Sequence, residues 1–334
     1  MNYYRILKIN RIVKSERIKI LGVGILFLLK KRYLNVFLDP VLACNFRCVM
    51  CYFSDPEYKP DKARIEKGKI DVVAENFFKY ALKLQIGCGA EPTLYLHNEE
   101  IIRQAKLHNV PHISFTTNAS LLDYNKIKSL VHAGLDEIIV SMHGTTKEVY
   151  EAMMPGAKIE KLYEVLEAVS KVKLEFPNFK LRINYTVNPD NIDNLAYIGD
   201  YLEKYKIDVL QIRPIRKIGN SAYSDFDLKR KQELYSKIIG GIEQKCKENN
   251  VVSLITKEVP DEILYRNTLD VAEYTYCYVS PVHYGNHSFD ASKSTYRKFL
   301  RTSGIFGKII KHVFFTRNRK YRADVNFGNY DVNI

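Results

Sequence analysis

Cysteine is scarce in this chain of 334 residues, which holds only six. So few thiols exclude a fold that depends on many disulfide bonds, and they suit a protein of a reducing cytosol. We therefore expect a cytoplasmic location. Three of the six lie in one short segment, CNFRCVMC, which runs from Cys44 to Cys51. Clustered thiols in a reducing compartment usually bind a metal or take part in catalysis.

Long apolar runs are missing as well. The run ILGVGILFLL near the N-terminus has ten residues, whereas a membrane-spanning helix needs about 20. A signal peptide would place its apolar run closer to Met1 and would end in small residues, but here the basic residues KKR follow. The sequence thus argues against export and against a transmembrane anchor. Residues 1–32 are expected to form a helical extension packed on the domain, with a helix lying on a membrane surface as the alternative.

Acidic residues are outnumbered by basic ones, 38 against 51, which gives a formal net charge of +13. This balance favours an anionic partner such as a phosphate, an acidic peptide, nucleic acid or a membrane surface, although net charge alone names no ligand. A basic surface without a specific partner explains the charge equally well. No nucleic-acid-binding motif occurs in the sequence. We therefore do not expect nucleic acid as a partner, in spite of the aromatic and basic tail KHVFFTRNRKYRADVN.

Strand-like runs alternate with helix-like segments through most of the chain. Alternation of this kind predicts βαβ units with a parallel sheet and right-handed crossovers, and six units suit a barrel or a partial barrel. The rhythm fades after residue 250. We divide the chain into an N-terminal extension (1–32), a barrel core (33–225) and a C-terminal helix with an irregular region that covers the substrate (226–334). The predicted strands are 33–39, 82–88, 112–118, 136–142, 179–187 and 207–215, and the predicted helices are 70–82, 98–108, 123–133, 159–174, 191–204 and 226–249.

Polar residues gather toward the C-terminal ends of four of these strands. Because active sites of barrels and open parallel sheets lie at that edge, the polar residues predict a shared site there. A single polar residue in a buried strand is as easily a satisfied core group. The residues are Ser114, Thr116 and Asn118; Ser141 and His143; Arg182, Asn184 and Thr186; and Gln211 and Arg213.

The three-cysteine segment favours an iron–sulfur centre among the metals that thiolates bind, which include zinc and copper(I). A structural zinc site needs four ligands, and the sequence has no second C-x-x-C pair. A simple [4Fe–4S] electron carrier uses four cysteines. Three cysteines would leave one iron open to another ligand.

The spacing C-x-x-x-C-x-x-C after the first strand resembles that of radical S-adenosylmethionine (SAM) enzymes. The second strand runs into GCGAEPTL (87–94), which resembles the GGEP loop of that family. Further resemblances follow in the same order: TTNASLL to the family's TTNG, VSMHG to its VSLDG, and NYTVNPDNIDNL to its segment at the fifth strand. The resemblance covers about residues 34–216. It implies an α/β fold with the partial (β/α)6 barrel of the radical SAM type.

The resemblance also implies roles for individual residues. Cys44, Cys48 and Cys51 would bind three irons of one [4Fe–4S] cluster, and SAM would chelate the fourth iron. Met50 stands where the family often has an aromatic residue against the adenine. In place of the family's Arg before Pro-Gly, this chain has Met154, which removes one basic contact to SAM. The remaining SAM-binding residues would be Gly89, Ala90 and Glu91 at the methionyl amino group, and Asn118, Ser141 and Arg182 near the ribose or carboxylate.

The implied activity is reductive cleavage of SAM to a 5′-deoxyadenosyl radical, which takes a hydrogen atom from a substrate. A one-electron donor such as a flavodoxin or a ferredoxin would be a partner. The expected substrate is a peptide or protein side chain, with a nucleotide- or lipid-linked sugar as the alternative. An alternative of another class is a non-catalytic, cluster-bearing protein that binds nucleic acid. The resemblance assigns no catalytic residue. Groups that could face the substrate are His143, Gln211, Arg213 and Tyr278.

Few cysteines remain outside the cluster segment. The chain is most similar to the SPASM-type branch, whose members mature peptides and cofactors and often carry a cysteine-rich extension with further clusters. Here only Cys88, Cys246 and Cys277 are left. Cys246 falls on an apolar helical stripe, and Cys88 lies inside the SAM loop. We therefore predict a degenerate or missing SPASM module and a single cluster.

Overall fold

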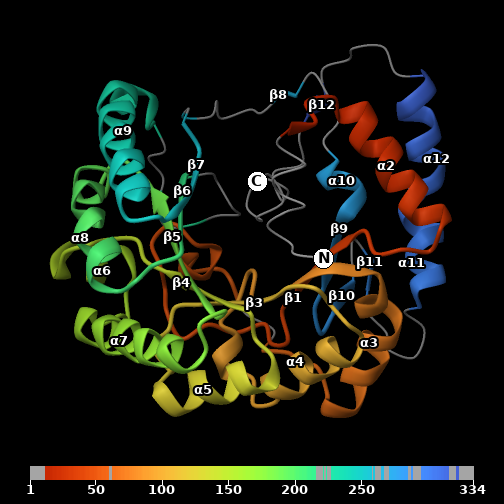
Figure 1. Ribbon diagram of the computed structural model, residues 1–334, viewed down its shortest axis with the longest axis horizontal. Helices are drawn as coiled ribbons and strands as arrows, with labels where there is room; N and C mark the ends of the chain where they lie inside the picture. Colours follow the sequence, from red (N-terminus) through yellow and green to blue (C-terminus); the bar gives the residue numbers. More distant parts are fainter. Residues whose placement is uncertain are drawn as a thin grey trace. The chain divides into compact units, whose positions relative to one another are not determined.

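The structure is a computed structural model, and Figure 1 shows its ribbon. It describes residues 12–59, 62–215, 221, 223, 227–257, 259, 265–266, 271–284, 287–288, 295–315 and 321–322. The chain divides into two compact units. The first unit combines residues 1–42, 62–114 and 263–334, and the second combines residues 43–61 and 115–262. The division into 1–32, 33–225 and 226–334 stays a prediction.

The first unit contains a mainly parallel sheet in the order β11-β10-β9-β1-β2. Strand β1 (Leu34–Leu38) pairs in parallel with β2 (Ala81–Ile86) and with β9 (Tyr276–Val279). Strand β10 (His283–Tyr284) is antiparallel to β9 and to β11 (His287–Ser288). A separate two-stranded sheet joins β8 (Tyr265–Arg266) to β12 (Tyr321–Arg322). The C-terminal strand β9 thus lies beside the strand that begins the fold.

Short helices accompany these strands in the first unit. They follow the sequence closely: α4, for example, buries Ile101, Ile102 and Ala105 on one face and places Glu99 and Glu100 in its first turn, where the helix dipole favours acids. The helices are α2 (Glu16–Leu28), α3 (Ile70–Phe77), α4 (Asn98–Leu107), α10 (Ala272–Thr275), α11 (Tyr296–Ser303) and α12 (Ile305–Ile310), followed by a π-helical turn (Lys311–Phe315) and accompanied by 3-10 turns at Lys67–Lys69, Phe78–Tyr80 and Pro92–Leu94.

The second unit is a parallel sheet whose strands run β4-β5-β6-β7. Strand β3 (Ile113–Thr117) contains the point where the chain passes from the first unit to the second. The strands are β4 (Glu137–Ser141), β5 (Lys180–Val187), β6 (Val209–Pro214) and β7 (Val252–Ile255). The helices are α5 (Tyr124–Ala133), α6 (Lys147–Met153), α7 (Ile159–Glu175), α8 (Ile198–Lys204) and α9 (Gln232–Glu248), with 3-10 turns at Tyr52–Ser54, Asp193–Tyr197 and Lys229–Lys231.

Strand β5 shows how this sheet is buried. Leu181 and Ile183 on one face are fully buried, and so is Arg182 on the other face. Burial of both faces is expected for parallel strands that are covered by helices. The polar residues on the second face must therefore find partners inside the protein.

The six predicted strands are confirmed, each to within two residues at either end. The region after residue 250 holds more regular structure than the sequence indicates. Strands β7 and β9 both lie there, and each joins a parallel pair. Their short length hides them, because four residues are too few to show a period. Within the described residues, no helix combines the length and the apolar character needed to cross a bilayer.

Candidate functional site

The cysteine loop, residues 44–51, opens the second unit. All three of its cysteines are outside any disulfide and are partly exposed. The loop turns around Arg47, whose Nη1 donates hydrogen bonds to the carbonyl oxygens of Cys44 at 2.9 Å and Phe46 at 2.8 Å. A hydrogen bond from the amide of Cys51 to the carbonyl of Cys48 closes the last turn at 2.9 Å. The Arg47 guanidinium and the loop's own backbone therefore shape the loop together.

The segment 153–156 holds this loop through two backbone hydrogen bonds. The amide of Arg47 donates to the carbonyl of Pro155 at 3.0 Å, and the amide of Val49 donates to the carbonyl of Met153 at 3.1 Å. Gly156 follows with a φ of +100°, and a Cβ atom there would lie 3.2 Å from the Phe46 ring. Only glycine adopts this conformation at little cost. The segment in which the family's arginine is absent thus supports the cysteine loop through its backbone.

Asn118 lies beside the first cysteine. Its Nδ2 is 4.0 Å from the Cys44 Sγ and donates to the Asn45 Oδ1 at 2.9 Å. Ser120 completes the group, since it donates to the Asn118 Oδ1 at 2.8 Å and accepts from the Asn45 Nδ2 at 2.8 Å. The structure therefore brings together two residues that the sequence singled out. Asn45 and Ser120 were not predicted, although both stand next to predicted residues in the sequence.

The thiols differ in their surroundings. Burial raises the pKa of Cys51, against the opposing effect of backbone N–H groups of Phe53 and Tyr52 and the nearby Arg47 charge. The amide of Phe46 donates to the Cys44 Sγ at 3.4 Å. Donors aimed at sulfur favour a thiolate over a thiol. Met50 is 7% exposed and packs inside the unit.

The donor set fits a [4Fe–4S] cluster. Within the described residues, no three His, Cys, Asp or Glu side chains converge on a point where they could hold one metal ion. A cluster makes no such demand, because each thiolate bonds to a different iron. Three cysteines with N–H donors near sulfur fit an iron–sulfur site. That Cys44, Cys48 and Cys51 bind the cluster stays a prediction.

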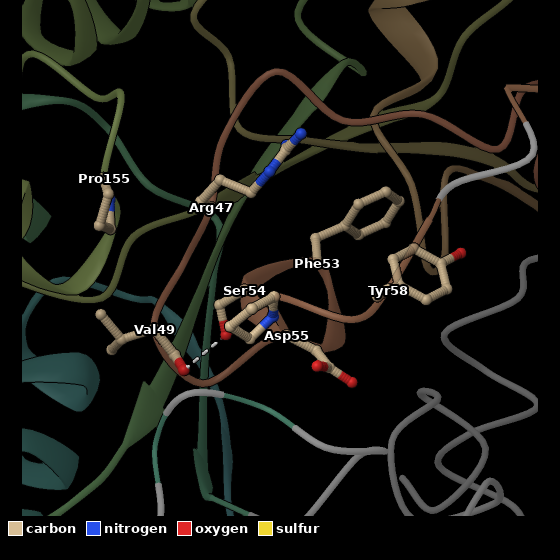
Figure 2. A pocket seen from close by; sticks show the side chains of 8 residues that line it. Arg47, Val49, Phe53, Ser54, Asp55, Tyr58 and Pro155 are labelled. Atoms are coloured by element: carbon tan, nitrogen blue, oxygen red, sulfur yellow. Dashed lines mark hydrogen bonds between the residues drawn. The ribbon is translucent and has the colours of Figure 1, made fainter.

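A pocket of about 430 Å³ opens on the outer side of this loop, and none of the three cysteines lines it. Figure 2 shows Arg47 and Phe53 on one wall of the pocket, with the Arg47 guanidinium carbon 6.0 Å from the Phe53 ring centre. The Ser54 hydroxyl donates to the carbonyl of Val49 at 3.0 Å and ties the pocket to the cysteine loop. The complete lining is Arg47, Val49, Phe53, Ser54, Asp55, Pro56, Tyr58 and Pro155.

The glycine-rich loop, residues 87–92, belongs to the first unit and depends on one carboxylate. Asp39 is 1% exposed, and its Oδ1 accepts the amide of Cys88 at 2.7 Å while its Oδ2 accepts that of Gly89 at 3.0 Å. The hydroxyl of Tyr278 on β9 donates to the same carboxylate at 2.8 Å. Burial raises the pKa of Asp39, and these donors, together with the amide of Ala90, oppose that shift. Asp39 and Tyr278 thus hold the loop in shape.

Sequence reasoning did not single out Asp39. A signal was present, because an acid at the end of the apolar run YLNVFLD is unusual and calls for a partner. Tyr278 was expected to face the substrate, but its hydroxyl is bonded to Asp39.

Glu91 is 2% exposed and acts as a cap. Its Oε1 accepts from the amide of Thr93 at 3.1 Å and from the Thr93 hydroxyl at 2.6 Å, at the start of the turn Pro92–Leu94. The partners of a predicted SAM ligand are therefore local. A role of Glu91, Gly89 and Ala90 toward SAM stays a prediction.

Arg182 has a partner that the sequence did not suggest. Its guanidinium forms a fully buried ion pair with Glu137, with an Nε–Oε1 distance of 3.2 Å, and donates to the Gln211 Oε1 at 3.2 Å. A buried charge is tolerated only with such a partner. Ser141 ends β4 and is partly exposed, opposite Asn184 on β5. Contacts of Arg182 and Ser141 with SAM stay predictions.

The proposed substrate-side groups of the second unit lie at the C-terminal ends of β4 and β6. His143 accepts a hydrogen bond on Nδ1 from the amide of Thr186 at 3.1 Å, so its other nitrogen carries the proton. Burial, followed by the nearby charge of Arg213, lowers the pKa of His143 to about 4. Gln211 is already bonded to Arg182. His143 is thus neutral near neutral pH, and Arg213 is partly exposed.

The remaining cysteines lie apart from the loop in the sequence and are largely covered. Cys246 is buried on α9 and Cys277 is fully buried on β9. Burial raises the pKa of both thiols, to about 11 for Cys246. The core position of Cys246 is confirmed. Cys88 packs near Phe37 and Ala272, as a small apolar residue does.

Two sequence relatives each match a little over half of the chain. A probable GTP 3′,8-cyclase of Sulfurisphaera tokodaii is 26% identical over 196 residues, which are 59% of this chain and 60% of that protein. A probable GTP 3′,8-cyclase of Metallosphaera sedula is 29% identical over 179 residues, or 53% of this chain and 54% of that protein. The chain thus spans a little over half of the length of these curated relatives.

Solved structures confirm the fold. The crystal structure of Streptococcus suis SuiB bound to precursor peptide SuiA gives a TM-score of 0.64 at 15% identity, over 86% of this chain and 69% of that one. Native anSMEcpe with bound AdoMet and the Cp18Cys peptide gives 0.62 at 16% identity, over 85% and 84% of the two chains. These similarities show the α/β partial barrel of the radical SAM type.

The sequence pattern of the Radical SAM superfamily matches residues 39–209, which contain both the cysteine loop and the glycine-rich loop. This match covers 171 of the 334 residues. The chain therefore belongs to the radical SAM superfamily of enzymes, which use a [4Fe–4S] cluster and SAM.

Proposed function

We propose that this enzyme cleaves SAM reductively and abstracts a hydrogen atom from a peptide or protein side chain. The observation that carries the proposal is the cysteine loop, with three cysteines outside any disulfide on a backbone that is fixed by Arg47 and by segment 153–156. When bound there, a [4Fe–4S] cluster supplies one electron to SAM, which yields a 5′-deoxyadenosyl radical. The electron would come from a small donor protein such as a flavodoxin or a ferredoxin, in the cytoplasm.

Different residues of the chain would bind the cluster and SAM. Cys44, Cys48 and Cys51 would hold the cluster, and Asn118 would donate a hydrogen bond toward the sulfur of Cys44 from 4.0 Å. N–H donors near a cluster sulfur tune the reduction potential. The glycine-rich loop would bind the methionyl amino group of SAM, with its backbone held by Asp39.

His143 is the best-placed substrate-side group. It is neutral near neutral pH, because its pKa is lowered to about 4. Its Nδ1 accepts the Thr186 amide, which places the proton of the neutral ring on Nε2. A neutral donor suits a carbonyl oxygen, which peptides present at every residue.

Two observations support a peptide. SuiB and anSMEcpe, whose folds this chain shares over 86% and 85% of its length, were crystallised with peptides. In the C-terminal region, Tyr276 and Tyr278 on β9 are partly exposed. Tyrosine offers a flat apolar face with a polar tip, which suits peptide backbones and side chains.

A nucleotide is the second candidate. Sequence relatives of this chain are named as probable GTP 3′,8-cyclases, and each matches a little over half of it. The formal net charge of +13 suits a triphosphate. A lipid-linked sugar is also anionic, so the positive charge of the chain suits it in the same way.

Deuterium transfer tests the proposal. Anaerobically reconstituted enzyme would be given dithionite, SAM and candidate substrates deuterated at carbon: peptides encoded beside the gene, GTP, and nucleotide sugars. We expect 5′-deoxyadenosine that carries deuterium from a peptide. Deuterium from GTP or a sugar and from no peptide would overturn the substrate class, whereas S-adenosylhomocysteine as the main product would overturn the radical reaction itself.

A further inference from the structure

Helices α2 and α12 form a pair in the first unit (Figure 1). A Cβ atom added at Gly24 would lie 3.2 Å from the Ile309 Cγ2, so the two backbones approach closely. The rings of Phe27 and Phe306 lie 6.1 Å apart. On its inner side α2 buries Ile20 and Val23. This helix is therefore packed on the unit, as the sequence favours.

The outer side of α2 is apolar too. Ile18, Leu21, Ile25 and Leu28 are exposed by 61%, 44%, 49% and 64%. Their spacing of three, four and three residues places them along one face of the helix. A surface helix normally turns its apolar stripe inward and its charges outward. Here the second apolar stripe faces away from the core.

The neighbouring helix repeats this feature. Phe306 and Ile310 of α12 are four residues apart and are exposed by 47% and 38%. We call these six residues, Ile18, Leu21, Ile25, Leu28, Phe306 and Ile310, the outer apolar stripes. Large exposed apolar side chains gathered on adjacent elements mark an interaction surface.

Basic residues surround the outer apolar stripes. Residues 12–32 contain six Lys or Arg and one acid, and residues 295–315 contain five Lys or Arg and no acid. The single acid, Glu16, pairs with Lys19 at 2.6 Å and accepts the amide of Val271 at 2.9 Å. Lys14, Lys30, Lys31, Lys308 and Lys311 are exposed. The surface is therefore apolar along the helices and positive at their ends.

We propose that α2 and α12 dock on the surface of an anionic lipid membrane, with the outer apolar stripes inserted among the acyl chains near the headgroups. With 13 residues α2 is too short to span a bilayer, which takes about 20. A helix with an apolar face and basic ends lies in the interface instead. The lysine side chains can reach the lipid phosphates while their stems stay in the apolar layer.

Two other occupants suit this surface less well. A second copy of the chain would bring eleven basic residues against another eleven, with one acid on each side, and like charges repel. Nucleic acid would match the charge, but its phosphates and base edges gain nothing from exposed aliphatic side chains.

Vesicle co-sedimentation tests the proposal on the full chain with its cluster reconstituted. Vesicles would be phosphatidylcholine alone, or equal parts of phosphatidylcholine and phosphatidylglycerol. We expect binding to the anionic vesicles that weakens as salt rises, because salt screens the charges. Leu21→Gln with Ile25→Gln should weaken binding on the order of tenfold or more, since two large side chains lose their apolar insertion.

The matched control is Leu107→Gln with Leu174→Gln, which changes two leucines that are 71% and 69% exposed elsewhere. Control and wild type should bind alike, and both double variants should keep SAM cleavage. The proposal is overturned if the wild type ignores anionic vesicles or if the control weakens binding equally. Conversion of a dimer to a monomer by the Leu21 and Ile25 changes, without an effect on vesicles, would overturn it in favour of a second copy. Failure of SAM cleavage in the wild type would instead count against the proposed function alone.

Discussion

The cysteine loop and the glycine-rich loop are built in opposite ways. Backbone contacts shape the cysteine loop: the carbonyls of Met153 and Pro155 hold its amides. The glycine-rich loop is held by a side chain, because the buried carboxylate of Asp39 accepts its amides at 2.7 and 3.0 Å. A loop held by backbone tolerates changes of its side chains, whereas a loop held by one carboxylate depends on that residue. The cysteine loop can thus leave its thiols free for metal.

The largest effect should come from removing the thiols. Changing Cys44, Cys48 and Cys51 together to Ala should abolish iron binding without unfolding the chain, because the backbone contacts remain. Iron analysis and visible absorption of anaerobically prepared protein measure this, and the wild type should carry close to one [4Fe–4S] cluster. The control is Cys246→Ala, which should keep its iron. Iron that persists in the triple variant would refute the assignment, and a second cluster in the wild type, seen by Mössbauer spectroscopy, would refute the claim of a single one.

The next effect concerns the buried carboxylate of Asp39. Asp39→Asn should weaken SAM binding by on the order of tenfold to a hundredfold, because hydrogen bonds to a charged group contribute about 1.5–3 kcal/mol. Iron content should not change. Tyr278→Phe removes one donor and should have a smaller effect in the same direction. Isothermal titration with SAM and the EPR signal of the SAM-bound cluster are the measurements.

Tyr33→Phe is the control for these two variants, since it removes a hydroxyl that pairs with Tyr296 in the same unit at 3.0 Å. It should leave SAM affinity unchanged. If Tyr33→Phe and Tyr278→Phe weaken SAM binding alike, Tyr278 has only a general structural role.

A third test separates the cap of Glu91 from its charge. Glu91→Ala should weaken SAM binding by about tenfold with iron intact, since it removes both the cap on Thr93 and the carboxylate proposed for the SAM ammonium. Glu91→Gln keeps an acceptor for the Thr93 amide and loses only the charge. Equal SAM affinity in Glu91→Ala and wild type would contradict any role for this residue, and full affinity in Glu91→Gln would assign it to the cap.

A substitution at Gly156 tests whether the backbone of segment 153–156 supports the cysteine loop. Gly156→Ala places a side chain at a φ of +100° and 3.2 Å from the Phe46 ring, which should cost about 1–2 kcal/mol and loosen the cysteine loop. Faster iron loss to a chelator would show this. Gly240→Ala is the control, because a Cβ there has no neighbour within 4 Å. Equal rates of iron loss in the two variants would mean that segment 153–156 does not support the loop.

The last test is a pH dependence in the second unit. The pKa of His143 is lowered from 6.5 to about 4 by burial, so the unfolded chain takes up a proton at a higher pH than the folded chain. Stability should therefore fall as the pH drops from about 6.5 to about 4. Thermal melting at a series of pH values measures this. The melting temperature of the His143→Gln variant should fall less over the same pH range. An imidazole NMR titration of His143 near pH 6.5 would contradict the lowered pKa.

The sequence by itself determined the elements that depend on local pattern. The six strands follow from short apolar runs between helical periods, and the cluster segment follows from three thiols within eight residues. The proximity of Asn118 to Cys44 agrees with this pattern, because both follow strands of one parallel sheet, β1 and β3, whose C-terminal ends share an edge.

Only the tertiary structure decided the contacts between distant residues. Asp39 meets Tyr278 across 239 positions, Arg182 meets Glu137 across 45, and β9 lies beside β1. The sequence marks a buried charge as needing a partner but does not name that partner, because the choice depends on strand register and on which faces pack together. The outer apolar stripes show the same limit. The apolar run of α2 is evident in the sequence, but packing against α12 decides which of its faces is buried and which remains outside.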